Sequence, residues 1–281
     1  MSREQFLKSL FDTSGVGLEV GPSYNPLLPK KNGYNIETLD YLSREDLIEK
    51  YKNAPNVNVS NIENVDYVMG GKSLYETICK DGHYDFIVAS HVIEHTTDII
   101  GFLNDCDKLL NKNGKIILAV PDKRFCFDVF RTLSSTGDVI QASIENRKCH
   151  TIGNVFDELM YNALRNEVAG WLPFDRGELA FFNSADKAKH IFDNIKKDEK
   201  PIDIHAWQFT PSSFRLILND LYQNNFIQLS ELQFHDANGE FFAVLDREGS
   251  TLSISRITLA KRIIEEQSKI HVTSNKKVVN P

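Results

Sequence analysis

The side chains with the clearest chemical potential lie in three short stretches. The first, GLEVG, places Glu19 two residues before Gly21 at the end of an apolar run. The second ends on Asp40, about 20 residues past that glycine, where an acid can accept hydrogen bonds from both hydroxyl groups of a ribose. The third, HVIEH at residues 91–95, offers histidines that can accept a proton near neutral pH. Together these stretches predict a site for a nucleotide-like ligand with a proton acceptor beside it.

These stretches follow apolar segments that have the character of strands, with helical patterns between them. We expect strands at 16–20, 34–39, 65–69, 84–90 and 115–120, and helices at 43–53, 73–80 and 97–110. The alternation predicts an α/β protein with a mostly parallel sheet, and such sheets bind ligands beyond the carboxyl ends of their strands. The residues expected to bind a cofactor there are Glu19, Gly21, Pro22, Asp40, Gly70, Gly71, Ser90 and His91.

The connection between the first two expected strands is unusual. It spans residues 21–34 and contains Pro22, Pro26 and Pro29. A parallel crossover needs a dozen or more residues, so the path closes, but the prolines leave little room for a full helix.

The rest of the chain predicts a helical insertion and a closing hairpin. The segment 122–205 has helical patterns at 138–148, 154–168 and 185–197 and is expected to act as a lid. Strands at 226–234 and 240–246 complete a seven-stranded sheet whose last strand is antiparallel. We therefore expect one domain over 1–258, followed by a C-terminal helix and a loose tail over 259–281.

The glycine turn discriminates between two kinds of ligand. A dinucleotide requires G-x-G-x-x-G, so that a helix N-terminus can approach the pyrophosphate. Here Gly21 is followed by Pro22 and by no clear helix, and Glu19 would repel a pyrophosphate. The stretch favours a cationic ligand without phosphate, such as a sulfonium with an α-amino group, even if its contact with Glu19 runs through water.

The longer motifs resemble those of class I S-adenosylmethionine-dependent methyltransferases. The matching stretches are LEVG at 18–21, ETLD at 37–40, YDFIVASHVIEH at 84–95 and LLNKNGKIILAVP at 109–121. The resemblance covers about residues 14–125. More loosely, DIHAWQFTP at 203–211 and the final hairpin resemble a bacterial subgroup whose members often accompany glycosyltransferases of surface-polysaccharide assembly.

This resemblance implies a Rossmann-like sheet, S-adenosylmethionine as cofactor and a small acceptor, either a saccharide or a glycan-precursor hydroxyl. It implies that Glu19 and Gly21 lie at the methionine end of the cofactor and that Asp40 holds the ribose. It also implies that residues 70–72 lie along the adenine, while Ser90 and His91 line the floor beneath the methyl group. The sequence departs from the family at Gly70, where an acid often holds the adenine amine, so backbone groups would substitute.

The histidines are the candidates for a general base, which helps methyl transfer to a hydroxyl of high pKa. His91 is the first candidate, followed by His95 and His205, with His150 as a further one. The same HVIEH stretch matches the H-x-x-E-H pattern of zinc proteases, but that pattern requires one long helix, and here it follows a strand directly. No third ligand is evident, so we expect no metal.

Composition excludes several classes of protein. The formal net charge of −7 makes nucleic acid a poor partner. No run of about 18 apolar residues could span a membrane, and the four cysteines predict reduced thiols in a cytoplasmic protein. Two alternatives remain open: an NAD(P)-dependent sugar oxidoreductase or epimerase, and a non-catalytic module with a methyltransferase-like fold.

Overall fold

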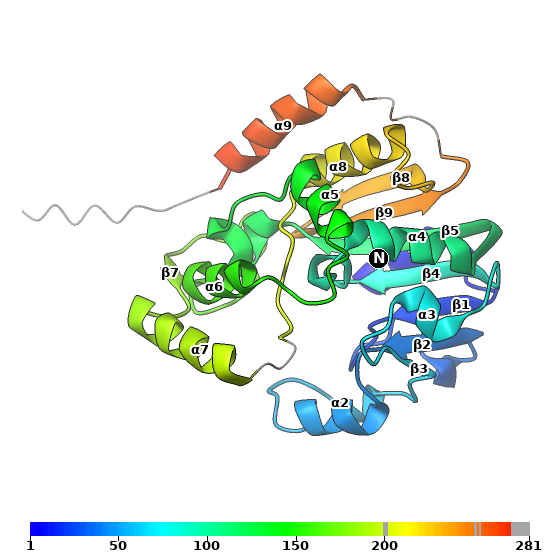
Figure 1. The fold of residues 1–281 in the computed structure, drawn as a ribbon, viewed down its shortest axis with the longest axis horizontal. Coiled ribbons are helices and arrows are strands. Elements are labelled where there is room, and N and C mark those ends of the chain that lie inside the picture. Colours follow the sequence, from blue (N-terminus) through cyan, green and yellow to red (C-terminus); the bar gives the residue numbers. More distant parts are fainter. Residues whose placement is uncertain (199–201, 250–251, 253, 271–281) are drawn as a thin grey trace, which may run out of the picture.

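A sheet of seven strands forms the centre of the computed structural model, which describes residues 1–198, 202–249, 252 and 254–270 (Figure 1). The strand order is β3-β2-β1-β4-β5-β9-β8. The first five strands are parallel, whereas β9 is antiparallel to both β5 and β8. The expected Rossmann-like class is therefore confirmed. The strands are β1 (Gly17–Val20), β2 (Ile36–Asp40), β3 (Tyr67–Val68), β4 (Tyr84–Ser90), β5 (Leu110–Pro121), β8 (Ser230–Ala237) and β9 (Glu240–Asp246).

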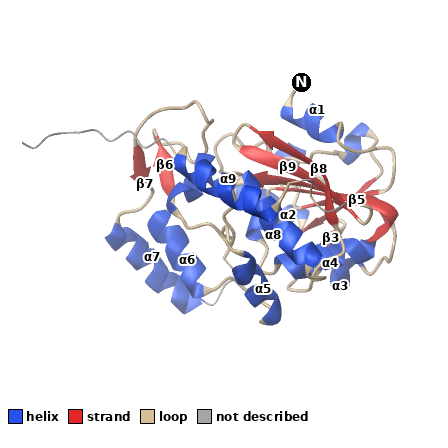
Figure 2. Ribbon diagram, turned by 90° about the horizontal axis from the view of Figure 1, so that it is seen from above, coloured by secondary structure: helices blue, strands red, loops and turns tan. Residues whose placement is uncertain are grey.

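Helices cover both faces of the sheet (Figure 2). On β4, Ile87 and Ala89 pack toward one face, and Phe86 and Val88 pack toward the other. The first face is covered by α3 (Leu74–Ile78), α4 (Ile99–Leu109) and α8 (Pro211–Gln223). The second is covered by α1 (Arg3–Lys8) and by the loop after β1, whose Leu27 and Leu28 are buried. This two-sided burial explains why the central strand β4 and the second half of β5 are almost continuously apolar.

The connection from β1 to β2 contains only a short 3₁₀ turn, η1 (Lys30–Asn32). The prediction that the prolines exclude a full helix is therefore confirmed. After β2 the chain forms α2 (Arg44–Tyr51), with Ser43 as its N-cap.

Several boundaries differ from the sequence predictions; for example, α5 spans Thr136–Ile144 rather than 138–148, and β3 spans Tyr67–Val68 rather than 65–69. Asp98, not Thr97, caps α4, because its carboxylate accepts a hydrogen bond from the Gly101 amide. Strand β5 begins at Leu110 rather than at 115, and β8 begins at Ser230 rather than at 226. Pairing with neighbouring strands, which the local sequence pattern does not report, determines where these strands begin.

The segment 122–205 lies beyond the carboxyl end of β5 (Figure 1). The predicted helix over 154–168 is wrong at its C-terminal end: Asn166 and Glu167 have left-handed φ angles of 49° and 67°, which a right-handed helix excludes. Residues 163–165 instead form a hairpin strand. The elements of the segment are η4 (Lys123–Phe125), η5 (Phe127–Phe130), α5 (Thr136–Ile144), α6 (Ile152–Tyr161), β6 (Ala163–Arg165), β7 (Leu179–Phe181) and α7 (Ala185–Asp198).

The C-terminal helix α9 (Arg256–Ser268) packs along α8. The expected loose tail falls largely on 271–281, outside the described residues. The domain bounds of 1–258 and 259–281 stay a prediction. Among the described residues, no helix has both the length and the apolar character needed to cross a bilayer.

Candidate active site

The turn after β1 lies against the end of β2. The Gly21 amide donates a hydrogen bond to the Leu39 carbonyl at 2.7 Å, and Gly21 has a φ of +65°. Ser23 also adopts a left-handed φ, +48°. A backbone that turns this sharply leaves little side-chain bulk between the ends of β1 and β2, which suits close approach of a ligand.

Asp40 holds this turn. One carboxylate oxygen accepts a hydrogen bond from the Ser23 amide at 3.1 Å, and the other accepts one from the Tyr41 amide at 2.8 Å. The side chain is buried, and burial raises the pKa of Asp40 despite these amide bonds. Each carboxylate oxygen can accept a second hydrogen bond, so the group keeps its capacity to bind hydroxyls. The structure thus brings Gly21 and Asp40 together.

Glu19 lies below the turn rather than in it. Its two oxygens accept hydrogen bonds from the Leu27 and Leu28 amides at 2.6 and 3.1 Å, and its side chain is 3 % exposed. In this structure Glu19 anchors the crossover from β1 to β2, which contains no α-helix. The expected contact with a ligand amine stays a prediction.

The ends of β3 and β4 lie at the same edge of the sheet. The Met69 amide donates a hydrogen bond to the Asp40 carbonyl at 3.0 Å, which places the exposed Gly70–Gly71 turn beside Asp40. At the end of β4, the Ser90 hydroxyl accepts a hydrogen bond from Arg3 of α1 at 2.9 Å.

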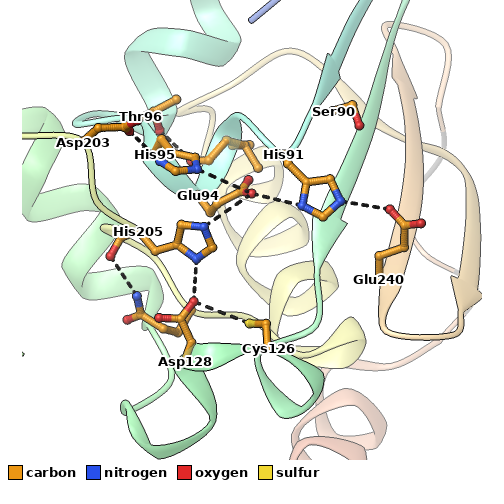
Figure 3. A network of polar contacts seen from close by, with 12 residues as sticks. Ser90, His91, Glu94, His95, Thr96, Cys126, Asp128, Asp203, His205 and Glu240 are labelled. Atoms are coloured by element: carbon orange, nitrogen blue, oxygen red, sulfur yellow. Dashed lines mark hydrogen bonds and ion pairs between the residues drawn. The ribbon is translucent and has the colours of Figure 1, made fainter. Parts of the chain in front are cut away.

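The histidines converge on one carboxylate that the sequence analysis did not select (Figure 3). Glu94, in η3 (Ile93–His95), is fully buried. Its Oε1 lies 3.5 Å from Nδ1 of His91 and 4.0 Å from Nε2 of both His95 and His205. Three of the histidine candidates are therefore neighbours, although His205 lies more than a hundred residues further along the chain.

A second layer of carboxylates surrounds these histidines. Nδ1 of His205 lies 2.5 Å from Asp128, and Nδ1 of His95 lies 2.8 Å from Asp203. Nε2 of His91 lies 3.1 Å from Glu240 of β9. These acids come from η5, from β9 and from the segment before α8, and no spacing rule links such distant positions to HVIEH.

The charges in this cluster perturb one another. Burial alone would raise the pKa of Glu94, but His91, His205 and His95 lower it below its usual range. Burial alone would lower the pKa of His91, yet Glu240 and Glu94 raise it to about 9. At neutral pH His91 is therefore protonated, and its surroundings do not favour it as the base.

A cavity of about 480 Å³ is lined in part by residues 206–208, which directly follow His205. Neither Glu19 nor Gly21 nor Asp40 lines it. The same segment contacts the histidine cluster, since the Ala206 amide donates to the Glu94 carbonyl at 2.7 Å. Polar and aromatic groups mix in the lining, which includes Phe130, Arg131, Asp138, Gln141, Asn154, Asp157, Tyr161, Trp207 and Gln208.

The Gly21 turn can be tested through stability. A Cβ at Gly21 would lie 2.9 Å from Cγ2 of Val92, in addition to the strain of a φ of +65°. We expect Gly21→Ala to lower the free energy of unfolding by more than the roughly 1–2 kcal/mol typical of a left-handed residue. Gly33→Ala is the matched control, because Gly33 has a φ of +86° and open space around it. Equal losses in urea unfolding of the two variants would contradict close packing at Gly21.

Comparison with known proteins identifies a family that this chain matches. A model of a methyltransferase domain matches residues 3–195, more than half of the chain. No curated protein matches the chain. Among solved structures, a SAM-dependent methyltransferase from Thermotoga maritima is 20 % identical over 43 % of this chain and 50 % of its own, with a TM-score of 0.33. The chain thus spans about half of that protein's length.

Two further SAM-dependent methyltransferases align over most of their length. The one from Methanosarcina mazei is 10 % identical over 85 % of this chain and 95 % of its own, with a TM-score of 0.42. The one from Aquifex aeolicus is 11 % identical over 86 % and 87 %, with the same TM-score of 0.42. These likenesses are weak, and the family model is the stronger finding.

Proposed function

Because the chain belongs to the methyltransferase-domain family, we propose that its acceptor is a saccharide or a related glycan precursor and that a hydroxyl oxygen receives the methyl group. The family match confirms the expected enzyme class, and with it S-adenosylmethionine as the cofactor, over the oxidoreductase and non-catalytic alternatives. When bound, S-adenosylmethionine supplies an electrophilic methyl group on a cationic sulfur.

The edge formed by β1 and β2 fits the adenosyl part of that cofactor. The hydroxyl oxygen of Ser23 is buried there without a hydrogen-bond partner in the described part of the chain, next to the carboxylate of Asp40. A buried polar atom without a partner is costly, and a ligand hydroxyl would satisfy it. In this proposal Asp40 and Ser23 bind the ribose, and the backbone at Gly21 and Pro22 approaches the methionine end.

The ends of β3 and β4 would supply the remaining contacts with the cofactor. The Gly70–Gly71 turn, beside Asp40, would lie along the adenine. Ser90 and His91, at the end of β4, would line the floor beneath the methyl group. The cationic ring of His91 is held between Glu94 and Glu240, so its role here is to orient those acids rather than to accept a proton.

The single observation that carries the saccharide proposal is the character of the 480 Å³ cavity. Sugars present many hydroxyls and flat apolar faces, so sites for them combine planar polar side chains with aromatic rings. Gln141, Asn154 and Asp157 supply the polar groups, and Tyr161 supplies an exposed ring. Arg131 joins the cavity to the histidine cluster, because it donates to the His205 carbonyl at 2.6 Å.

In this proposal the histidine cluster takes up the proton that the acceptor hydroxyl loses when it is methylated. His95 and His205, each with Nδ1 next to a carboxylate, are the histidines with an Nε2 that faces Glu94. Association with glycosyltransferases of polysaccharide assembly and a cytoplasmic location complete the proposal and stay predictions.

The test is incubation of the chain with methyl-deuterated S-adenosylmethionine and a small-molecule bacterial extract. We expect mass spectrometry to find the labelled methyl group on the oxygen of a sugar. Tyr161→Ala should then raise the KM for that sugar by roughly tenfold, because a stacking ring is lost. Phe226→Ala removes an exposed ring outside the cavity and should leave KM unchanged. Label confined to nitrogen atoms or to non-sugar molecules would reject the saccharide acceptor.

A further inference from the structure

The carboxylate of Glu94 is an unusual feature of this cluster. The side chain is fully buried, and neither of its oxygens makes a hydrogen bond within the described part of the chain. The ring nitrogens around it stand at 3.5 to 4.0 Å, beyond hydrogen-bond reach or at its limit. A buried carboxylate is costly without a positive charge close to it, and the cationic ring of His91, 3.5 Å from Oε1, supplies one such charge without making a hydrogen bond.

Two of the three histidine rings, those of His95 and His205, point their Nε2 atoms toward Glu94. In His205 the Nδ1 atom lies 2.5 Å from Asp128, and in His95 it lies 2.8 Å from Asp203. In His205 the Asp128 carboxylate can only accept, so it favours the ring proton on Nδ1. The Nε2 atoms of His95 and His205 both face Oε1 of Glu94 at 4.0 Å, too far for a hydrogen bond. The three atoms therefore surround a space that a cation can occupy.

Histidines that bind metals have this arrangement. One nitrogen coordinates the ion, while the other donates to a carboxylate or carbonyl that fixes the tautomer. Asp128 is itself held by Arg131 at 3.0 Å, so the carboxylate that orients His205 is rigidly placed. The two rings are nearly perpendicular, with centroids 4.6 Å apart. His95 is the last residue of η3, and the segment that follows His205 packs on η3 through the Ala206 amide.

We propose that Glu94, His95 and His205 bind a divalent transition-metal ion, with Zn²⁺ as the simplest occupant. One ligand atom from each residue lies within 4.8 Å of the others, and both Nε2 atoms lie 4.0 Å from the same oxygen. Zinc bonds to nitrogen and oxygen measure about 2.0–2.2 Å, which places tetrahedral ligand atoms about 3.3–3.6 Å apart, so the three atoms must approach one another by roughly 0.5–1.5 Å when the ion binds. Imidazole with a carboxylate suits Zn²⁺, Fe²⁺, Co²⁺ or Ni²⁺ better than Mg²⁺ or Ca²⁺.

This site differs from the protease-like one that the HVIEH pattern suggests. His91, the first histidine of the pattern, faces Glu240 instead. His205 is the third ligand that the HVIEH pattern did not provide. Three protein ligands leave coordination positions open, as in catalytic rather than structural zinc sites. His95, with 32 % of its side chain exposed, forms the accessible side. A bound ion occupies the Nε2 lone pairs of His95 and His205, so in the metal-bound chain neither ring accepts the acceptor proton. Ion binding itself does not depend on which acceptor the enzyme uses.

The test uses the full chain, stripped with a chelator and then titrated calorimetrically with ZnCl₂. We expect one equivalent of Zn²⁺ to bind, and Co²⁺ to give an absorption spectrum without the thiolate charge-transfer band that surface cysteines would produce. Glu94→Gln, His95→Gln and His205→Gln should each weaken the binding by at least tenfold. Asp128→Asn, which removes the carboxylate that orients His205 and pairs with Arg131, should weaken it by about 10- to 100-fold.

His83→Gln is the matched control, because His83 is exposed and lies outside the cluster. It should bind Zn²⁺ as the unaltered chain does. His95→Gln, at the partly exposed ligand, keeps the test valid if substitution of the buried Glu94 prevents folding. The proposal is overturned if the stripped chain binds no stoichiometric Zn²⁺, or if folded His95→Gln and His205→Gln bind it with unchanged affinity.

Discussion

Asp40→Ala is expected to weaken the binding of S-adenosylmethionine by roughly 5- to 150-fold, which corresponds to about 1–3 kcal/mol lost from hydrogen bonds to a charged group. The carboxylate has two tasks in this account: it holds the Ser23 amide and so shapes the turn, and it accepts bonds from the ribose. Isothermal titration calorimetry at constant salt measures the change directly. Asp40→Asn, which keeps one acceptor oxygen, should fall between Asp40→Ala and the unaltered chain.

The control for Asp40 is Asp85, a carboxylate at the opposite edge of the sheet, near the start of β4. Asp85 accepts a hydrogen bond from the Val16 amide at 2.6 Å, just before β1 begins. Asp85→Ala should cost stability without changing the affinity for the cofactor. If folded Asp40→Ala binds S-adenosylmethionine as tightly as the unaltered chain, Asp40 is not part of the cofactor site.

Glu19→Gln is expected to remove a large pH dependence of stability. Burial raises the pKa of Glu19 from 4.5 to about 7, against the opposing effect of the Leu27 and Leu28 amides. A carboxyl group that binds its proton more tightly in the folded protein contributes stability fully below pH 4.5 and loses that contribution as the pH rises through 7. The loss is on the order of 3 kcal/mol. The amide side chain introduced by Glu19→Gln does not titrate, and it keeps an acceptor oxygen for one of the two backbone amides.

The measurement is urea unfolding of both proteins from below pH 4.5 to above pH 7. Other groups titrate in the same range, so the quantity of interest is the difference in unfolding free energy between Glu19→Gln and the unaltered chain. We expect this difference to shift in favour of the variant as the pH rises. A difference that is constant with pH would show that Glu19 titrates normally in the folded protein.

The sheet was predictable because its signals are local. Apolar residues bounded by turn residues indicate β1, β4 and the second half of β5, and the motifs at 18–21, 37–40 and 84–95 coincide with β1, β2 and β4. The same locality explains the failures. The hairpin formed by β6 and β7 depends on pairing between Ala163 and Phe181, and the local sequence of neither strand indicates this pairing.

The histidine cluster was only half predictable for a similar reason. HVIEH indicated His91 and His95, and His205 was a candidate as a proton acceptor. The residue that organises them, Glu94, was taken as part of a rejected protease pattern. Glu94 matters because it is completely buried and because residues 203–208 pack against it. Both features depend on the tertiary structure, which the local sequence does not indicate.

The account rests on the cofactor being held where β1 turns onto the end of β2. The most direct test is a crystal structure of the chain with S-adenosylhomocysteine, the demethylated product. We expect its ribose hydroxyls to lie within hydrogen-bond distance of Asp40, with the homocysteine chain along Gly21 and Pro22. A fully occupied ligand in the 480 Å³ cavity beside Arg131, with the β1–β2 edge unchanged, would contradict this placement.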